Sequence, residues 1–209
     1  MKEVRSFVRR NSRLTNSQKT HLSAHSGMLR EQLPEVLPSH FQSIGLEIGF
    51  GMGDSLLDVA RKNPNQLWIG IEVYEVGIAS VIRQAKEENM DNILLLRGDA
   101  IEMLSNKTSD LRLDHVRVFF PDPWPKKRHH KRRLLSAETL SLLAKHMTLG
   151  GLLHVATDHE LYAEDVNRLL ASHDSFTLCL ETLYRPLTKF AVKAIAAGST
   201  ITDIVARTS

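Results

Sequence analysis

Apolar and polar positions follow two alternating patterns along the chain. Short runs rich in Val, Ile and Leu are typical of buried strands, and segments with apolar residues three or four positions apart are typical of helices that cover a sheet. The runs that predict strands are 44–49, 67–73, 92–97, 115–120, 152–156, 176–181 and 201–206. The segments that predict helices are 54–62, 76–90, 136–150 and 162–172.

Strands that alternate with helices predict a parallel sheet covered on both faces. We therefore expect an α/β, Rossmann-like fold, with a doubly wound, mostly parallel, seven-stranded sheet and helices on both faces. A chain of 209 residues is long enough for one such domain and too short for two. In sheets of this kind, ligands bind at the carboxyl ends of the strands.

Positive charge is concentrated in two segments of a chain whose net charge is only +3. Residues 1–30 and residues 126–133 each carry a net charge of +6, which leaves the remainder of the chain at −9. An acidic body with two basic segments is expected when a polyanion is bound at defined places. We therefore expect residues 1–35 to form a basic amino-terminal arm that its partner orders, and residues 36–209 to form the single domain. A solvated charged face and a tail without a role are the alternatives.

The sequence also lacks the features of several classes of protein. The first ten residues carry charges where a secretory signal has an apolar core, and no apolar run is long enough to cross a membrane. We therefore expect a cytoplasmic protein with no membrane contact. Cys179 is the only cysteine, so no disulfide framework and no CxxC metal knuckle is expected. No metal site and no obligate protein partner is evident.

The first predicted strand ends in a glycine-rich turn, Glu47-Ile48-Gly49-Phe50-Gly51-Met52-Gly53, which opens onto a helix. Glycines let backbone N–H groups approach a ligand closely. A Walker A loop would end in Gly-Lys-Ser/Thr, and a dinucleotide fingerprint would have glycine where Asp54 stands. An acid inside the strand suits a cationic ligand better than a pyrophosphate. A site for S-adenosylmethionine is therefore predicted at Glu47, Gly49, Gly51 and Gly53, with Glu47 facing the amino-acid end of the ligand.

Two further acids stand at the ends of the next two predicted strands. Glu72 lies nineteen residues after Gly53, a spacing at which an acid hydrogen-bonds ribose hydroxyls. Asp99 follows the third strand and is placed to meet an adenine amino group. Each acid alone could equally be a solvated charge at a strand end. Together with the glycine turn, at the carboxyl ends of successive strands, they predict one nucleoside-binding site.

A proline-rich turn joins an acid and an aromatic residue to a dense cationic run. In Phe119-Phe120-Pro121-Asp122-Pro123-Trp124-Pro125 the prolines fix φ and orient Asp122 and Trp124 before a substrate arrives. The run that follows, 126–133, contains six Lys/Arg and no acid. The nucleic-acid contacts predicted in it are Arg128, His129, His130, Lys131, Arg132 and Arg133. The two histidines are neighbours that point in different directions, so contact with a nucleic-acid backbone is a better interpretation for them than a metal pair.

Several motifs are spread over most of the chain: RSFVRRNSRLT, LEIGFGMG, IGIEV, RGDA, FFPDPWPKKRHHKRRL, VATDHELYA and RPLTKF. Together they resemble the bacterial tRNA (guanine-N(7)-)-methyltransferase family. The resemblance implies a class I methyltransferase fold, S-adenosylmethionine as methyl donor, and a variable-loop guanine of tRNA as substrate. It implies that Glu47, Glu72, Asp99 and Asp122 line the cofactor site and that Asp122 is catalytic. The substrate contacts that it implies are Lys126, Asp158, Thr188, Lys189, Phe190 and the position of Ala191, where the family usually has Glu.

The chemistry of this reaction fits the residues. Nitrogen-7 of guanine is an acceptor with a free lone pair, so it can attack a sulfonium methyl without first losing a proton. A fixed carboxylate such as Asp122 stabilises the positive charge that moves onto the ring. A guanine stacked in folded tRNA has to be extruded, and Phe120 or Trp124 can stack on it. Two alternatives stay open: a non-catalytic tRNA-binding relative with a pocket altered at Ala191, and a nicotinamide-dependent oxidoreductase.

Overall fold

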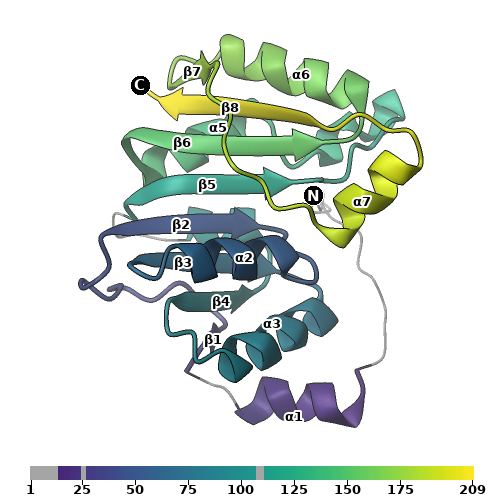
Figure 1. The fold of residues 1–209 in the computed structure, drawn as a ribbon. Coiled ribbons are helices and arrows are strands. Elements are labelled where there is room, and N and C mark those ends of the chain that lie inside the picture. The colour runs from purple at the N-terminus through teal and green to yellow at the C-terminus, as the bar shows by residue number, and fades with distance from the viewer. Residues whose placement is uncertain (1–13, 25–26, 107–110) are drawn as a thin grey trace.

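Eight strands form one sheet in the computed structural model, which describes residues 14–24, 27–106 and 111–209 (Figure 1). The strands are β1 (Leu29–Arg30), β2 (Ser43–Ile48), β3 (Gln66–Glu72), β4 (Ile93–Arg97), β5 (Leu113–Phe119), β6 (Met147–Thr157), β7 (Phe176–Cys179) and β8 (Thr202–Thr208). The helices are α1 (Asn16–Ala24), α2 (Asp54–Lys62), α3 (Glu75–Glu87), α4 (Ala100–Ser105), the 3-10 helix η1 (Lys127–Arg132), α5 (Ala137–His146), α6 (Glu160–Ala171) and α7 (Lys189–Ala196).

The order of the strands across the sheet is β1-β4-β3-β2-β5-β6-β8-β7. β8 runs antiparallel to both of its neighbours, and the other pairs are parallel. The chain builds outward from β2 through β3 to β4, and then returns to place β5 on the other side of β2. A reversal of this kind is where open α/β sheets form a ligand crevice, at the carboxyl ends of the two strands.

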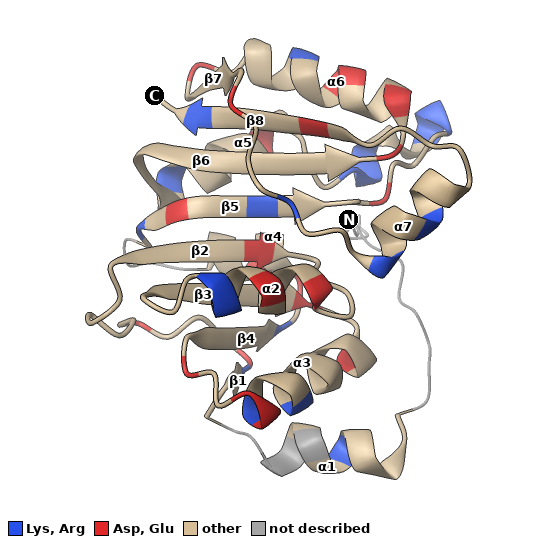
Figure 2. Ribbon diagram, viewed as in Figure 1, with Lys and Arg blue, Asp and Glu red and all other residues tan. Residues whose placement is uncertain are grey.

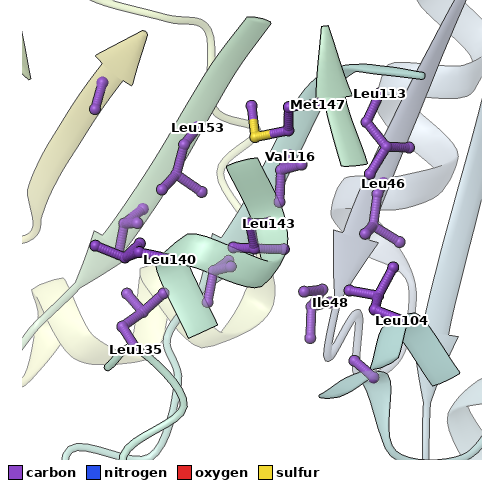
Figure 3. Close-up of a cluster of buried hydrophobic side chains, with 14 of the residues drawn as sticks. Leu46, Ile48, Leu104, Leu113, Val116, Leu135, Leu140, Leu143, Met147 and Leu153 are labelled. Atoms are coloured by element: carbon purple, nitrogen blue, oxygen red, sulfur yellow. The ribbon is translucent and has the colours of Figure 1, made fainter. Parts of the chain in front are cut away.

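Helices cover both faces of the sheet. On one face, α2 and α3 bury Leu56 and Ile82 in a cluster that includes Trp68 of β3. Figure 3 shows the cluster on the other face, where Leu104 of α4 and Leu140 of α5 pack with side chains of β2, β5 and β6. Lys, Arg, Asp and Glu lie mainly on the helices and loops (Figure 2). With both faces covered, the edge formed by the carboxyl ends of the strands is where a ligand can reach the backbone.

The α/β class, the helices on both faces and each predicted strand are confirmed. The sheet has eight strands rather than seven, because Leu29–Arg30 add β1 beside β4 at the edge. The helix predicted over 136–150 ends at His146, and Met147 already begins β6. The prediction took Gly150 as the end of that helix, but this glycine lies inside β6 with a φ of 77°. The sequence patterns do not predict α1, α4, η1 or α7.

Part of the segment predicted as an amino-terminal arm belongs to the folded body. α1 packs on α3, with Leu22 against the apolar cluster of that face. β1 is a strand of the sheet. Residues 1–13 and 25–26 of the predicted arm lie outside the described residues. The division of the chain into arm and domain therefore stays a prediction.

Candidate functional site

A pocket lies at the carboxyl ends of four neighbouring strands, β4, β3, β2 and β5. The glycine turn after β2 contributes two residues, and the ends of β3 and β4 contribute 71–74 and 98–100. The end of β5 contributes 119–122. The pocket brings together five of the predicted site residues, which are Gly49, Gly51, Glu72, Asp99 and Asp122.

The turn after β2 needs glycine for two different reasons. Gly49 and Gly51 have positive φ angles of 73° and 57°, which residues with a side chain seldom adopt. Gly53 precedes α2 and also has a positive φ, of 89°, and a Cβ at this position would in addition lie 2.0 Å from Cγ2 of Val81 in α3. Gly49 and Gly51 therefore bring bare backbone to the pocket, whereas Gly53 lets α3 pack closely against the start of α2.

Glu72 ties the end of β3 to the glycine turn. One carboxylate oxygen accepts the N–H of Gly51 at 2.7 Å. The other accepts the N–H groups of Val73 at 2.6 Å and Tyr74 at 2.9 Å. The residue is 8% exposed and lines the pocket. Glu72 therefore shapes the turn as well as offering carboxylate oxygens to a ligand.

Asp99 is the residue that caps α4. Its Oδ1 accepts the N–H groups of Ile101 at 2.8 Å and Glu102 at 3.3 Å. Both bonds use the same oxygen, so Oδ2 is the atom that can meet a ligand in the pocket. The cap also explains why α4 begins directly at the site, because a helix start needs an acceptor for its first N–H groups.

Glu47 lies outside the pocket wall and is 2% exposed. The hydroxyl of Ser55 donates to its Oε2 at 3.0 Å, and Nη1 of Arg117 lies 3.8 Å from the same oxygen. Burial raises the pKa of Glu47 to about 7, against the opposing effects of the Arg117 charge and the Ser55 hydrogen bond. Glu47 of β2 and Arg117 of β5 are direct partners in the register of these two neighbouring strands. The carboxylate predicted to face a cationic ligand is thus already paired with a cation of the protein.

The proline-rich loop after β5 holds Asp122 between two strained residues. Phe120 and Trp124 have positive φ angles of 52° and 43°. This conformation costs of order 1–3 kcal/mol for residues other than glycine. The N–H of Phe120 donates to the carbonyl oxygen of Ala156 at 2.7 Å, which fixes the start of the loop to β6. The surrounding structure therefore holds the loop in a conformation that an isolated chain would not keep. In this conformation Asp122 lines the pocket.

The basic run after this loop forms η1 and the residues beside it. Its members differ in exposure. The exposed cations are Lys126, Lys127, Arg128, Lys131 and Arg132, and the half-buried residues are His129, His130 and Arg133. The guanidinium of Arg132 lies 5.0 Å from the centre of the Trp124 ring. The Arg133 side chain is only 9% exposed, so a contact with nucleic acid suits the exposed cations and not this residue.

α7 and its cap contain four of the predicted substrate residues, one of which, Phe190, contacts a residue that lines the pocket. Thr188 caps this helix, and its hydroxyl accepts the N–H of Ala191 at 3.1 Å. The ring of Phe190 lies 4.8 Å from that of Phe120, which lines the pocket. Lys189 is exposed, whereas Ala191 is fully buried. The contact between the two rings places α7 next to the proline-rich loop, although the two are far apart in sequence.

Two other predicted substrate contacts lie at the same edge of the sheet. Lys126 precedes η1, and its carbonyl oxygen accepts the N–H of His129 at 2.7 Å. Asp158 directly follows β6 and is half-buried. Neither lines the described pocket, so their contacts with the substrate stay a prediction.

Two arginines with several contacts inside the protein are not predicted from the sequence. Nη2 of Arg117 donates at 2.9 Å to the carbonyl oxygen of Tyr184, in the segment that crosses the sheet from β7 to α7 (Figure 1). Arg185 binds both carboxylate oxygens of Asp203, at 2.7 and 3.1 Å, and its guanidinium lies 5.7 Å from the centre of the Phe120 ring. A single cation inside an otherwise apolar strand indicates a buried charge that needs a partner, and this signal could have identified Arg117. No comparable signal marks Arg185.

Two kinds of feature are absent from the residues that the structure describes. Among the helices in these ranges, none is long and apolar enough to cross a membrane. Within the same ranges, no group of three or more His, Cys, Asp or Glu is arranged to hold a metal ion.

Several solved structures share this fold. The 16S rRNA methyltransferase KamB superposes with a TM-score of 0.60 at 15% identity, over 82% of this chain and 90% of that chain. A putative methyltransferase from Streptococcus mutans, in complex with SAH, superposes with a TM-score of 0.55 at 11% identity, over 81% of this chain and 90% of that chain. The sheet order and these neighbours define the fold as that of the class I methyltransferases.

Sequence comparison narrows this class to a family. A family model described as a putative methyltransferase matches residues 42–204. The tRNA (guanine-N(7)-)-methyltransferase of Methylobacillus flagellatus is 40% identical over 98% of this chain and 91% of its own length. That of Nitrosococcus oceani is 40% identical over 96% of this chain and 89% of its own length. The chain belongs to the tRNA (guanine-N(7)-)-methyltransferase family, as its motifs predict.

Proposed function

We propose that this protein transfers the methyl group of S-adenosylmethionine to nitrogen-7 of a guanine in the variable loop of tRNA, in the cytoplasm. The observation that carries the proposal is the pocket, where acids from the ends of β3 and β4 and from the loop after β5 meet the glycine turn after β2. Membership of the family supports the reaction and the class of substrate.

The residues of the pocket fit S-adenosylmethionine. Glu72 offers carboxylate oxygens to ribose hydroxyls, and Oδ2 of Asp99 offers an acceptor to the adenine amino group. Gly49 and Gly51 leave the space beside them free of side chains. When bound, S-adenosylmethionine supplies an electrophilic methyl group on a positively charged sulfur. Glu47 and Gly53 do not line the pocket, and the cofactor contacts expected of them stay a prediction.

Asp122 is the catalytic residue in this proposal. Nitrogen-7 of guanine needs no base to become a nucleophile, because its lone pair is free. The ring gains positive charge as the methyl group is transferred, and a carboxylate held at the pocket stabilises that charge without reorganisation. The strained loop supplies the fixed position, since the prolines on both sides of Asp122 limit its backbone.

The surroundings of the pocket suit an extruded base and a phosphate backbone. The ring of Phe190 contacts that of Phe120, which lines the pocket, and Trp124 lies further along the same loop. An aromatic surface of this kind can stack on a base taken out of the tRNA. Contacts with the nucleotide are proposed for Lys126, Asp158, Thr188, Lys189, Phe190 and Ala191. Contacts with the tRNA backbone are proposed for Arg128, His129, His130, Lys131 and Arg132.

A methyl-transfer assay tests this proposal. The protein is incubated with radiolabelled S-adenosylmethionine and unmodified tRNA, and the tRNA is then digested and its nucleosides are separated. The label is expected in 7-methylguanosine, and a tRNA with adenine in place of the variable-loop guanine should stay unlabelled. Label in another nucleoside would contradict the proposal. Tight tRNA binding without any transfer would instead identify a non-catalytic tRNA-binding relative.

A further inference from the structure

Arg133 is the cation of the basic run whose side chain the protein encloses. Its Nε donates to the carbonyl oxygen of Pro123 at 2.9 Å, and its Nη1 donates to Oδ2 of Asp165 at 2.6 Å. Its Nη2 lies 3.2 Å from Nε2 of His130, and the guanidinium lies 4.7 Å from the centre of the Tyr162 ring. All three nitrogens therefore have partners within the protein. With 9% of the side chain exposed, little of it is accessible to a phosphate.

The loop that Arg133 reaches has few backbone N–H groups with which to hold its conformation. Pro121, Pro123 and Pro125 have no N–H to donate. Phe120 and Trp124 are held in left-handed conformations that an unrestrained loop would leave. A carbonyl in such a loop needs a donor from another part of the chain. Arg133 supplies that donor at the residue directly after Asp122.

The other end of this bridge lies on α6. Asp165 also accepts a hydrogen bond from Arg168, at 2.8 Å. The hydrogen bond from Arg133 is the main reason that the pKa of Asp165 is lowered, and it keeps this carboxylate charged. Tyr162, whose ring faces the guanidinium, is 1% exposed within the core. α6 therefore presents a fixed charge and a fixed ring that orient the guanidinium toward the loop.

We infer that Arg133 is a positioning residue for Asp122. It fastens the carbonyl of Pro123 to α6, and so holds the loop in the strained form from which Asp122 lines the pocket, instead of contacting tRNA. The inference rests on the proposed function for the part that concerns turnover. This role requires Arg, because a planar guanidinium can contact three partners at once through its three nitrogens. Lys has only one nitrogen, on a flexible stem, and cannot make the same set of contacts.

The experiment compares two changes at Arg133 with a matched control. Lys131→Gln removes the same charge as Arg133→Gln from an exposed neighbour, and it is expected to flatten the log–log salt dependence of tRNA affinity by roughly 0.7 to 0.9. Arg133→Gln is expected to leave that slope unchanged and to lower kcat by about 10- to 100-fold, the scale of a misplacement near 1 Å. Arg133→Lys keeps the charge and is expected to lose kcat in the same way.

Three results would overturn the inference. One is rescue of kcat by Arg133→Lys, because a phosphate contact needs mainly the charge. Another is a flattened salt slope for Arg133→Gln that matches Lys131→Gln. The third concerns Asp165→Asn, which removes the anchor on α6 and is expected to lower kcat. If Arg133 contacted phosphate, this change would leave kcat intact and tighten tRNA binding, since it removes a competing carboxylate.

Fluorescence tests the position of the loop without any turnover. The chain has two tryptophans, and Trp68 is 2% exposed, so acrylamide quenches mainly the fluorescence of Trp124. Arg133→Gln should increase this quenching and Lys131→Gln should not, and equal quenching in both would contradict the inference. A wild-type protein that transfers no methyl group would contradict the proposed function and leave this measurement valid. If Arg133→Gln does not fold, Arg133→Lys and Asp165→Asn carry the same comparison.

Discussion

Replacing Glu47 with Gln is expected to remove a pH dependence of stability that arises inside the core. The carboxylate is 2% exposed, and its partners are the hydroxyl of Ser55 and the guanidinium of Arg117. Gln has the same shape and keeps an acceptor for both partners. The change therefore removes the titrating group while it disturbs the packing little.

The magnitude follows from the two pKa values. Burial raises the pKa of Glu47 from 4.5 to about 7 in the folded protein. The folded state therefore binds the proton more tightly than the unfolded state, and stability falls as the pH rises from 4.5 through 7. The stabilisation is fully present below pH 4.5 and is lost above pH 7. At 1.36 kcal/mol for each pKa unit, the difference corresponds to about 3 kcal/mol.

Urea unfolding at a series of pH values between 5 and 8.5, roughly the window in which this group titrates, measures the effect. The free energy of unfolding of Glu47→Gln minus that of the wild type is expected to rise with pH by about 3 kcal/mol. Taking the difference removes the contribution of histidines, because both proteins contain them. Parallel pH profiles for the two proteins would refute the reasoning, and so would a difference that shrinks as the pH rises.

Three further predictions concern the site. Asp122→Asn should lower kcat by about 100-fold with little change in S-adenosylmethionine affinity, measured by methyl transfer and calorimetry; a near-wild-type kcat would remove Asp122 from the catalytic role. Glu72→Gln should weaken S-adenosylmethionine binding by roughly 10-fold or more and also lower the melting temperature, because the carboxylate holds Gly51. Replacing Arg128, Lys131 and Arg132 together with Ala should flatten the salt slope of tRNA binding by about 2 to 3, and an unchanged slope would mean that these cations are only solvated.

The fold was predictable because its strands are runs of buried apolar residues. The segments that were missed lack that signal. β1 has two residues, too few to show a period, and the cations of η1 mask any apolar pattern. The motifs predict 188–191 only as substrate contacts and not as a helix, although Thr188 is a typical residue to begin one. Short elements that depend on tertiary contacts leave little trace in local sequence.

The candidate site was predictable where residues follow strand ends. Glu72, Asp99 and Asp122 meet because parallel strands deliver their carboxyl ends to one edge. The prediction was less informative for Glu47, because the sequence does not show that Arg117 stands beside it on the neighbouring strand. A run of like charges likewise does not reveal which member turns inward, and only the packing around Arg133 distinguishes it from its neighbours.

The three prolines of the loop also decide which spectroscopic signals can report on it. A residue without an amide proton gives no amide resonance, so Pro121, Pro123 and Pro125 are silent in amide spectra. The indole N–H of Trp124 is the natural probe in their place. The other indole belongs to Trp68, which is buried and donates to Gln66 at 3.1 Å. A two-dimensional spectrum of ¹⁵N-labelled indoles should therefore contain one signal that responds to tRNA and one that serves as its internal reference.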